Sequence, residues 1–567
     1  MMNQYTQWLE RDPDPKTRHQ LQQLISDDNQ VALADCFNGR LAFGTAGLRG
    51  IVGCGPNRMN RLVIQETATG LGNYLIEQIE HAKTRGVVVG YDGRLDSQQF
   101  AYDTAAALNA LGIKVYLTYQ VAATPVVAYG IKTLNAAAAV VVTASHNPPE
   151  YNGFKVYWQN GAQIIAPHDS AIAEKIAQAT TKPINLMSMA EAEDQQLLHW
   201  LEEDYYQRYR QEISHNPLFS ATHSNSIAIA YTAMHGVGAN LAETLLADAG
   251  FTRVHSVAEQ RDPDGTFPTV NFPNPEEAGA MDLVIALATA TGSDLACAND
   301  PDADRFAVAA RHADGKFQML TGDQVGALLA DYLLSQCEPN EQLLGNSIVS
   351  SRLLAHITQA SGATYYQTLT GFKWLANIAM EMENDKLNFL FAYEEALGYT
   401  VGDTVRDKDG LSTLVIFALL TEKLKQQNRT VFDQLETIYR QHGLFVNRQR
   451  SLSLDANADP IGDKLRENPP KIIAGSPVVL VEDLKTSCRK WANGEHETID
   501  LPSSDVLIYH LEDQSRIIVR PSGTEPKLKC YYEVICDFPS SKHFEQVQTL
   551  ANNKMDILIE QHQAMLS

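Results

Sequence analysis

The sequence predicts an α/β protein with several domains, in which three α/β units precede a C-terminal α+β unit. The chain has 567 residues, enough for several domains at about 100–200 residues each. Between residues 62 and 445, short runs rich in Val, Ile and Ala alternate with segments of helical periodicity, which is typical of sheets covered by helices. After residue 445, candidate strands follow one another through short turns, which favours an α+β unit. We place the domains at residues 1–215, 216–318, 319–445 and 446–567.

The composition is that of an ordinary globular protein with a strongly acidic balance. Hydrophobic residues make up 44% and charged residues 20% of the chain, and the formal net charge is −23. A field of this sign repels nucleic acids and anionic membrane surfaces, so we expect neither as a partner. It also repels small anions, so any anion site needs its own local cluster of Arg, Lys or metal.

The cysteines and the apolar runs indicate the compartment. The seven cysteines are scattered and lack CxxC spacing, so we expect reduced thiols rather than disulfides or a zinc site. The N-terminal segment is polar, which argues against a secretory signal. No apolar run approaches the roughly 18 residues that cross a bilayer. We therefore expect a cytoplasmic protein.

The first domain should begin with a polar helical extension over residues 1–40 and continue as an α/β unit. Its last predicted strand ends at Ser145. The other elements predicted from periodicity are strands at 87–91 and 114–118 and helices at 62–80, 96–111, 124–133, 169–180 and 196–214.

The loop Thr143–Lys155 (TASHNPPEYNGFK) follows this strand, and we expect it to present Ser145 on an exposed tip. Pro148 and Pro149 prevent the strand from continuing and stiffen the exit. His146 and Lys155 are suited to managing the serine proton or stabilising a phosphate. The plain alternative for a Ser-His pair in a loop is a solvated turn.

A glycine-rich segment, LAFGTAGLRG, lies upstream at residues 41–50. Its three glycines in seven residues allow the backbone to approach a ligand closely, and Arg49 can project into that ligand. Such a segment is also compatible with a simple turn.

The second domain leads to three alternating aspartates. We predict strands at 226–236, 253–257 and 294–298, a helix from about 239 and a helix ending near 291. Asp300, Asp302 and Asp304 follow the last strand, and three convergent carboxylates repel one another unless a cation lies between them; hard oxygen ligands favour Mg²⁺. Arg305 can hold a phosphoryl oxygen beside it. A solvated acidic turn is the alternative, whereas an EF-hand fails because Arg305 and Arg311 occupy its glycine and glutamate positions.

The third domain carries candidate ligand-binding residues at its loops. The predicted elements are a helix at 322–335 and strands at 347–350, 363–366 and 388–392. Gly371 and Lys373 open a helix, which suits an anion. Glu394 follows the last strand, and Lys408 lies in the segment VRDKDG; an isolated loop lysine is ordinarily surface charge.

The fourth domain has strands predicted at 447–454, 478–482, 506–511, 516–520 and 528–536, with helices at 460–468 and from about 541. Between two of these strands lies RPSGTEPK, residues 520–527. Its glycine turn, hydroxyls and basic ends, Arg520 and Lys527, offer donors for a phosphate dianion. The segment is neither a Walker loop nor a Rossmann turn.

These motifs together resemble the α-D-phosphohexomutases, the phosphoglucomutase and phosphomannomutase family. The strings concerned are TASHNPPEYNGFK, FGTAGLRG, DPDADR, EEALGY with KDG, and RPSGTEPK, and they occur in the family's order over about residues 40–540. The resemblance implies three similar α/β domains and one α+β domain around a central cleft. It implies that Ser145 is a phosphoserine and, with Asp300, Asp302 and Asp304, a metal ligand. It further implies catalytic roles for Arg49, His146, Lys155 and Lys408, and substrate binding by Arg305, Gly371, Lys373, Glu394, Arg520, Ser522, Gly523, Thr524 and Lys527.

The resemblance also implies an activity. The expected reaction is isomerisation of a sugar phosphate, moving a phosphoryl group between the 1- and 6-positions of a hexose, with glucose phosphate favoured. Mg²⁺ and a sugar 1,6-bisphosphate are the expected cofactor and activator, and a monomer or weak dimer is expected. Ala396 stands where the family usually has serine, and the EEALGY form is closer to the branch with phosphopentomutase. Phosphomannomutase, phosphopentomutase, phosphatase or sugar-bisphosphate synthase activity, or a sugar-phosphate-binding regulatory role, therefore stay open.

Overall fold

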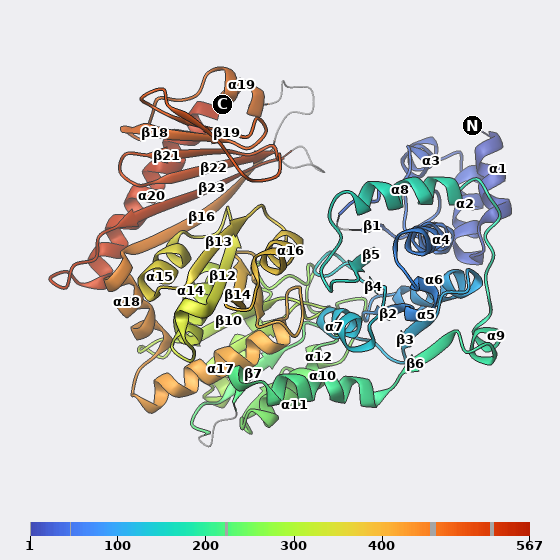
Figure 1. Cartoon of the computed structure of the whole chain (residues 1–567), viewed down its shortest axis with the longest axis horizontal. Coiled ribbons are helices and arrows are strands. Elements are labelled where there is room, and N and C mark those ends of the chain that lie inside the picture. The colour runs from blue at the N-terminus through green and yellow to red at the C-terminus, as the bar shows by residue number, and fades with distance from the viewer. Residues whose placement is uncertain (1, 46, 221–224, 454–460, 522–526, 567) are drawn as a thin grey trace. The chain divides into compact units, whose positions relative to one another are not determined.

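The computed structural model describes residues 2–45, 47–220, 225–453, 461–521 and 527–566. These residues form two compact units, each built from two separate stretches of chain. The first unit contains Met1–Leu320 and Ala396–Gln427, and the second contains Thr321–Glu395 and Asn428–Ser567. Figure 1 colours the chain from its N-terminus in blue to its C-terminus in red. Because these units are larger than the four predicted domains, the predicted boundaries stay predictions.

The first sheet of the first unit is mixed, with the strand order β1-β5-β4-β2-β3-β6. Strands β2, β3, β4 and β6 pair in parallel, whereas β5 is antiparallel to both β1 and β4. The central strands VVVGY and AAVVV are buried throughout, as expected for strands covered on both faces. The strands are β1 (Leu48–Ile51), β2 (Val87–Tyr91), β3 (Val115–Thr118), β4 (Ala138–Val142), β5 (Tyr151–Trp158) and β6 (Leu198–Leu201).

Helices surround this sheet. The segment predicted as one helix over 196–214 is wrong at its start, because Leu198–Leu201 pairs with β3 and only the following residues are helical. The helices are α1 (Met2–Arg11), α2 (Pro15–Ser26), α3 (Gln30–Phe37), α4 (Arg61–Gln78), α5 (Ala82–Arg85), α6 (Ser97–Ala110), α7 (Thr124–Leu134), α8 (His168–Ala179), α9 (Met189–Asp194), α10 (Glu203–His215) and the 3₁₀ turn η1 (Pro217–Phe219).

The second sheet of the first unit has the order β11-β10-β9-β7-β8 and is also mixed. Its strands are β7 (Ile229–Thr232), β8 (Val254–Ser256), β9 (Leu295–Asn299), β10 (Phe306–Arg311) and β11 (Phe317–Met319), and its helices are α11 (Ala239–Asp248), α12 (Ala258–Arg261) and α13 (Asp282–Thr291). A later stretch returns to this unit with β15 (Gly398–Val401) and α17 (Gly410–Gln426). The helix α17 is almost entirely buried and packs against α11, β9 and β10.

The second unit begins with parallel strands. Strand β12 lies between β13 and β14 and pairs in parallel with both. The predicted strand at 347–350 is wrong, because β12 ends at Ser347 and the chain turns there. The sequence of β12 contains polar residues and a glycine, so a search for apolar runs does not find this strand. The elements are β12 (Gln342–Ser347), β13 (Thr364–Thr368), β14 (Asn388–Glu394), α14 (Gly322–Leu334), η2 (Pro339–Glu341), α15 (Leu353–Ser361), α16 (Phe372–Met382) and α18 (Val431–His442).

The C-terminal part of the second unit is an antiparallel sheet with the order β16-β23-β22-β21-β18-β19-β20, against which α20 packs. This architecture confirms the prediction of α/β units followed by an α+β unit. The elements are β16 (Leu444–Ser453), β17 (Ile472–Ile473), β18 (Ser476–Asp483), β19 (Cys488–Trp491), β20 (His496–Thr498), β21 (Leu507–Leu511), β22 (Arg516–Pro521), β23 (Lys527–Cys536), α19 (Ile461–Glu467) and α20 (Phe544–Leu566). None of the helices in the described ranges is long and apolar enough to cross a membrane.

Within the second unit, a buried ionic cluster joins the antiparallel sheet to the start of α15. Glu533 on β23 is 1% exposed and accepts hydrogen bonds from the Arg352 backbone and guanidinium. Arg516 on β22 is 3.5 Å from the same carboxylate and donates to the carbonyls of Ile348 and Ser350. Burial acts to raise the pKa of Glu533, but the charges of Arg516 and Arg352 outweigh it and lower that pKa to about 2.

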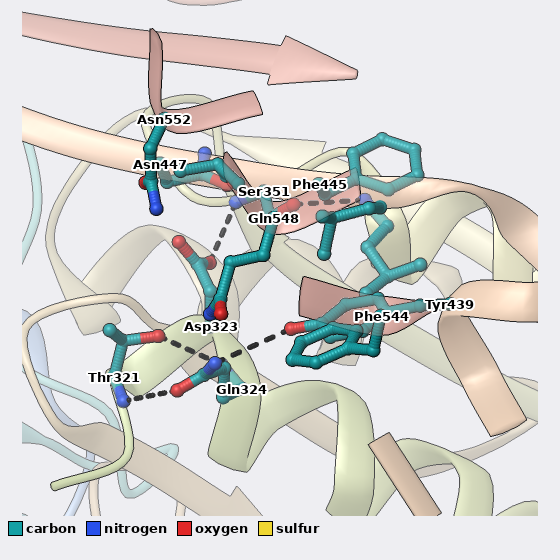
Figure 2. A pocket seen from close by; sticks show the side chains of 13 residues that line it. Thr321, Asp323, Gln324, Ser351, Tyr439, Phe445, Asn447, Phe544, Gln548 and Asn552 are labelled. Atoms are coloured by element: carbon teal, nitrogen blue, oxygen red, sulfur yellow. Dashed lines mark hydrogen bonds between the residues drawn. The ribbon is translucent and has the colours of Figure 1, made fainter. Parts of the chain in front are cut away.

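A cavity of about 110 Å³ with both polar and apolar lining residues lies in the same unit, formed by the start of α14 and by residues of β16 and α20. Asp323 Oδ1 accepts hydrogen bonds from the Ser351 N–H at 2.7 Å and the Tyr393 hydroxyl at 3.0 Å. Figure 2 shows the Asp323 carboxyl group among the amide side chains that line this cavity. Burial raises the pKa of Asp323 to about 7, and the charge of Glu395 acts in the same direction.

Candidate active site

Ser145 lies in the loop that follows β4, in direct contact with the acidic loop after β9. Its backbone N–H donates to Thr143 Oγ at 2.8 Å, and its φ of 51° is in the left-handed region. Its Oγ donates to Asp300 Oδ2 at 2.8 Å. Ser145 is only 3% exposed, so the expected exposed tip is wrong. The reason is tertiary: the acidic loop packs against the serine.

His146 and Arg49 flank this serine. His146 Nδ1 is 3.1 Å from Ser145 Oγ. Burial lowers the pKa of His146 well below its ordinary value, and the nearby charges of Arg305 and Arg49 lower it further, so the imidazole is neutral at neutral pH. Arg49 lies on β1 and donates to Asn147 Oδ1 at 3.0 Å. Both side chains therefore lie at the loop, as the sequence predicts.

In the glycine-rich segment before Arg49, packing within the protein requires a glycine at one position. Gly47 has a φ of 76°, and a Cβ at this position would lie 1.8 Å from the carbonyl oxygen of Phe154 on β5. No other residue fits there, because β1 pairs with β5 at this point. This close approach is to a neighbouring strand, whereas the sequence suggests an approach to a ligand.

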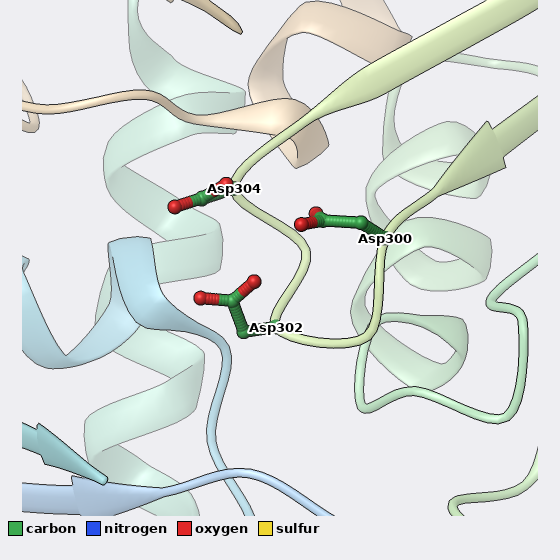
Figure 3. A group of neighbouring side chains, drawn as sticks. All are labelled: Asp300, Asp302 and Asp304. Carbon is green, nitrogen blue, oxygen red and sulfur yellow. The ribbon is translucent and has the colours of Figure 1, made fainter. Parts of the chain in front are cut away.

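The aspartates Asp300, Asp302 and Asp304 occupy the tight loop between the antiparallel strands β9 and β10. Each is at most 1% exposed, which excludes a solvated acidic turn. Figure 3 shows their carboxylates turned toward one another, and one oxygen from each lies within 4.8 Å of the others. Ala303 has a φ of 55°, which bends the loop between the second and third aspartate.

The three aspartates of the triad change one another's pKa, because their carboxylates lie close together. Burial raises the pKa of Asp300 well above its ordinary value, and the charges of Asp302 and Asp304 raise it further. Burial also acts to raise the pKa of Asp302, but Lys155 outweighs it, and the pKa is lowered. Lys155 Nζ lies 2.7 Å from Asp302 and 2.9 Å from Asp304, and these pairs raise the pKa of the lysine despite its burial. One lysine thus balances only part of the acidic charge.

The donor set fits a hard divalent cation. Asp302 Oδ1 and Asp304 Oδ1 are buried and accept no hydrogen bond from any described residue. A buried carboxylate oxygen without a donor is costly unless a cation approaches it. With Asp300 and the hydroxyl of Ser145, these atoms are the oxygen ligands that Mg²⁺ prefers.

Thr124, the first residue of α7, holds one of these carboxylates. Its hydroxyl donates to Asp302 Oδ2 at 2.6 Å, and its N–H donates to the Asp302 carbonyl at 2.9 Å. Such outer contacts orient metal-binding groups. Thr124 cannot be found from the sequence, because its only local signal is a Thr-Pro pair at a helix start.

Lys408 lies at the far side of the triad, 3.2 Å from Asp304 Oδ2. The neighbouring Asp407 is 1% exposed and accepts the Lys408 backbone N–H at 2.8 Å. Its other oxygen accepts the Tyr157 hydroxyl at 2.5 Å and the Gln163 amide at 2.9 Å. Asp407 is absent from the residues predicted for the site, although an aspartate directly before a candidate lysine is a usable signal.

Arg305 follows the triad. Its N–H donates to Asp300 Oδ1 at 3.0 Å, and its guanidinium lies 3.6 Å from Glu276. The first unit therefore brings together every candidate residue that the sequence places in it. These are Arg49, Ser145, His146, Lys155, Asp300, Asp302, Asp304, Arg305 and Lys408.

The remaining candidates belong to the second unit. Glu394, at the end of β14, accepts the backbone N–H of Gly371 at 2.7 Å. Gly371 has a φ of 109° and precedes α16, whose first turn contains Lys373. Arg520 lies near the end of β22, and Lys527 is the first residue of β23. Ser522, Gly523 and Thr524 lie outside the described residues.

Known protein families match this chain along most of its length. Models of the four domains of phosphoglucomutase/phosphomannomutase match in order: α/β/α domains I, II and III match residues 40–183, 207–315 and 321–442, and the C-terminal domain matches 481–543.

Curated relatives cover nearly all of the sequence. A phosphopentomutase of Pongo abelii is 34% identical over 98% of this chain and 94% of its own. A phosphoglucomutase of Staphylococcus haemolyticus is 36% identical, with coverages of 90% and 92%. A "Probable phosphomannomutase" of Haemophilus influenzae is 40% identical, with coverages of 84% and 93%. The crystal structure of pp63/parafusin, a phosphoglucomutase of Paramecium, is similar in fold, with a TM-score of 0.66 at 19% identity over 92% of this chain and 96% of its own.

Proposed function

Because the chain belongs to the phosphoglucomutase/phosphomannomutase family, whose members are intramolecular phosphotransferases, we propose that Ser145 carries the transferred phosphoryl group. The observation that carries this proposal is the 2.8 Å contact between Ser145 Oγ and Asp300 inside the buried acidic triad. Phosphoryl transfer depends on placing the nucleophile beside a centre that neutralises the phosphoryl charge. A serine already held at such a centre supports the assignment.

The proposed reaction has two transfers. The bond between phosphorus and Ser145 Oγ breaks as a bond forms between phosphorus and the free hydroxyl of a sugar monophosphate, which gives a bisphosphate. The bisphosphate turns end for end, and its other phosphate returns to Ser145, so the net result is isomerisation. His146, neutral and 3.1 Å from Ser145 Oγ, and Lys408 are the groups proposed to take and return the hydroxyl proton.

Asp300, Asp302, Asp304 and Ser145 are the residues proposed to hold Mg²⁺, which would supply positive charge against the transferring oxygens. The buried carboxylate oxygens without donors support this choice. Lys155, paired with two of the aspartates, would keep them ionised and in place. Arg49 and Arg305 are proposed to hold phosphoryl oxygens.

The second unit is proposed to recognise the rest of the substrate. Glu394 is suited to accept hydrogen bonds from neighbouring sugar hydroxyls. Gly371 donates its N–H to Glu394, and Lys373 follows in the first turn of α16. The second phosphate is assigned to the segment that starts at Arg520 and ends at Lys527, including Ser522, Gly523 and Thr524. Its basic ends and its Ser, Gly and Thr residues support this assignment.

Glucose phosphate, converted between the 1- and 6-phosphate, is the substrate we propose first, with glucose 1,6-bisphosphate as the activator that phosphorylates Ser145. Ribose phosphate is the second candidate, because Ala396 lacks a hydroxyl and a relative at 34% identity is named phosphopentomutase. Mannose phosphate is the third, on the relative named phosphomannomutase. A cytoplasmic monomer or weak dimer is proposed.

The test is an isomerase assay with Mg²⁺ and a trace of glucose 1,6-bisphosphate on the 1-phosphates of glucose, mannose and ribose. The test variant is Ser145→Ala, and the matched control is Ser170→Ala, an exposed serine at the start of α8. Peptide mass spectrometry of residues 138–158 measures phosphorylation of the serine. We expect one substrate to be converted far faster than the others, and only Ser145→Ala to lose conversion and phosphorylation.

The other outcomes separate the alternatives. A phosphorylated enzyme that converts none of the three sugars would refute the mutase for these substrates. Release of inorganic phosphate would then indicate a phosphatase, and accumulation of a bisphosphate from a separate donor would indicate a synthase. Binding without phosphorylation would indicate a regulatory sugar-phosphate-binding protein.

A further inference from the structure

Arg94 lies behind the Ser145 loop and is buried, with no exposed side-chain area. It follows β2, whereas the loop joins β4 to β5, so the two segments are distant in sequence. One guanidinium nitrogen donates to the carbonyls of Ser145, at 2.6 Å, and Asn147. The other donates to the carbonyls of Pro148, at 2.8 Å, and Tyr151, at 3.1 Å. A single side chain thus binds four carbonyls of one loop.

The loop needs such a partner for a physical reason. Two prolines and a left-handed serine prevent residues 145–149 from pairing as a strand, so the carbonyls of Ser145, Asn147 and Pro148 take no part in a sheet ladder. A buried carbonyl without a donor destabilises the folded state. The planar guanidinium of an arginine can donate hydrogen bonds to several carbonyls at fixed positions, whereas the ammonium group of a lysine cannot.

Arg94 is itself held from two sides. Asp92 Oδ2 lies 3.3 Å from Arg94 Nε, and Asp92 Oδ1 accepts the Arg94 N–H at 3.0 Å and the Ser97 hydroxyl at 2.7 Å. The ring of Phe267 lies 4.9 Å from the guanidinium carbon. The fork therefore has little freedom to turn, and neither does the backbone that it binds.

We propose that Arg94 is a positioning residue for phosphoryl transfer, which fixes the carbonyls of the Ser145 loop so that Ser145 Oγ stays against Asp300. This inference rests on the proposed function for its kinetic consequence. The loop must return to the same position for the second transfer as for the first. Because the Arg94 side chain has no exposed area from which to reach a substrate, it acts on turnover rather than on substrate binding.

Arg85 provides a matched control. It also binds backbone carbonyls, those of Asn135 at 3.0 Å and Ala136 at 3.1 Å, and it donates to Gln159 at 2.7 Å. These residues lie at the opposite end of β4, away from Ser145. If arginines that bind backbone carbonyls beside strand ends had only a structural role, both substitutions would have the same effect on kcat.

The experiment compares Arg94→Lys with Arg85→Lys in the full-length chain. For Arg94→Lys we expect kcat to fall about 100-fold, as for a displacement of reacting groups by roughly 1 Å, while KM changes less than about threefold. Amide hydrogen exchange should become at least about tenfold faster in peptides covering 143–152, and only there. Arg85→Lys should leave kcat and exchange of this loop unchanged.

An Arg94→Lys variant with the wild-type kcat, or with unchanged loop exchange, would overturn the proposal. If wild type itself converts no sugar phosphate, the proposed function fails, and the exchange data alone decide whether Arg94 positions the loop. If Arg94→Lys does not fold, Phe267→Leu loosens the guanidinium from behind. This variant should then show the same loss of kcat and loop protection to a smaller extent, and wild-type values for both would equally overturn the proposal.

Discussion

Replacing Glu533 by glutamine tests whether the buried ionic cluster stabilises the second unit. The change removes the charge that faces Arg352 and Arg516 but keeps the size of the side chain. Arg516 is 4% exposed, so the variant leaves a buried guanidinium without its counter-charge. We therefore expect a clear loss of stability at neutral pH.

The magnitude follows from the pKa of Glu533. Its value of about 2, against an ordinary value of 4.5, corresponds to about 3 kcal/mol of stability at pH 7. The cost of breaking a buried ion pair, about 3–5 kcal/mol, agrees with this. For a unit of this size, about 3 kcal/mol lowers Tm by about 6–12 °C.

The pH dependence has a definite sign. Because the folded pKa is lowered, this stability is fully present above pH 4.5 and is lost as the pH falls toward 2. In Glu533→Gln that part of the acid-induced loss should be missing. The two proteins should therefore differ most at neutral pH and converge in acid.

Differential scanning calorimetry from pH 3 to 8 measures both effects. Glu436→Gln is the control, because Glu436 pairs with Arg440 one helical turn away on α18 at a partly exposed position, where a pair contributes about 0.3–0.5 kcal/mol. Equal Tm values for the Glu533 and Glu436 variants at pH 7 would refute the reasoning. A deficit at pH 3 as large as the deficit at pH 7 would also refute it, because part of the stabilisation should be lost by then.

Three further changes test other parts of the structure. Asp323→Asn should remove a loss of roughly 3 kcal/mol that wild type suffers as the pH rises from about 4 to 7, because the raised pKa of about 7 means that the folded state favours the protonated acid; urea titrations at pH 5 and 8 measure it. Thr124→Val should weaken Mg²⁺ binding by about 10–100-fold, since Asp302 loses its hydroxyl donor, as calorimetric titration with Mg²⁺ can show. Asp407→Asn should lower kcat about tenfold with little change in KM, because Lys408 is held less firmly; steady-state kinetics measure it.

Local patterns were sufficient for the main strands, helices and motifs. The runs AAVVV and VVVGY are buried on both faces, so composition alone marks them as central strands. The alternating aspartates after β9 predicted a cation site because carboxylates so close together need one. The structure has both strands where the sequence predicts them and brings the three carboxylates close together.

Contacts between distant segments could not be predicted in this way. Thr124 and Asp302 are separated by 178 residues, and neither has a neighbour in sequence that reveals the other. The sequence pattern predicts strand β5 as part of the polar loop, because its first residues are Tyr-Asn-Gly and only pairing with β1 and β4 makes them extended. The burial of Ser145 likewise depends on a loop from a different sheet.

The return of residues 396–427 to the first unit has a consequence for synthesis on the ribosome. Helix α17 covers β9 and β10, but it is translated only after the first stretch of the second unit, Thr321–Glu395. Until residue 427 has left the exit tunnel, the nascent first unit exposes the apolar surface that α17 later buries. A chain cut after residue 320 should therefore aggregate or recruit chaperones, although the cut falls between two matched domains.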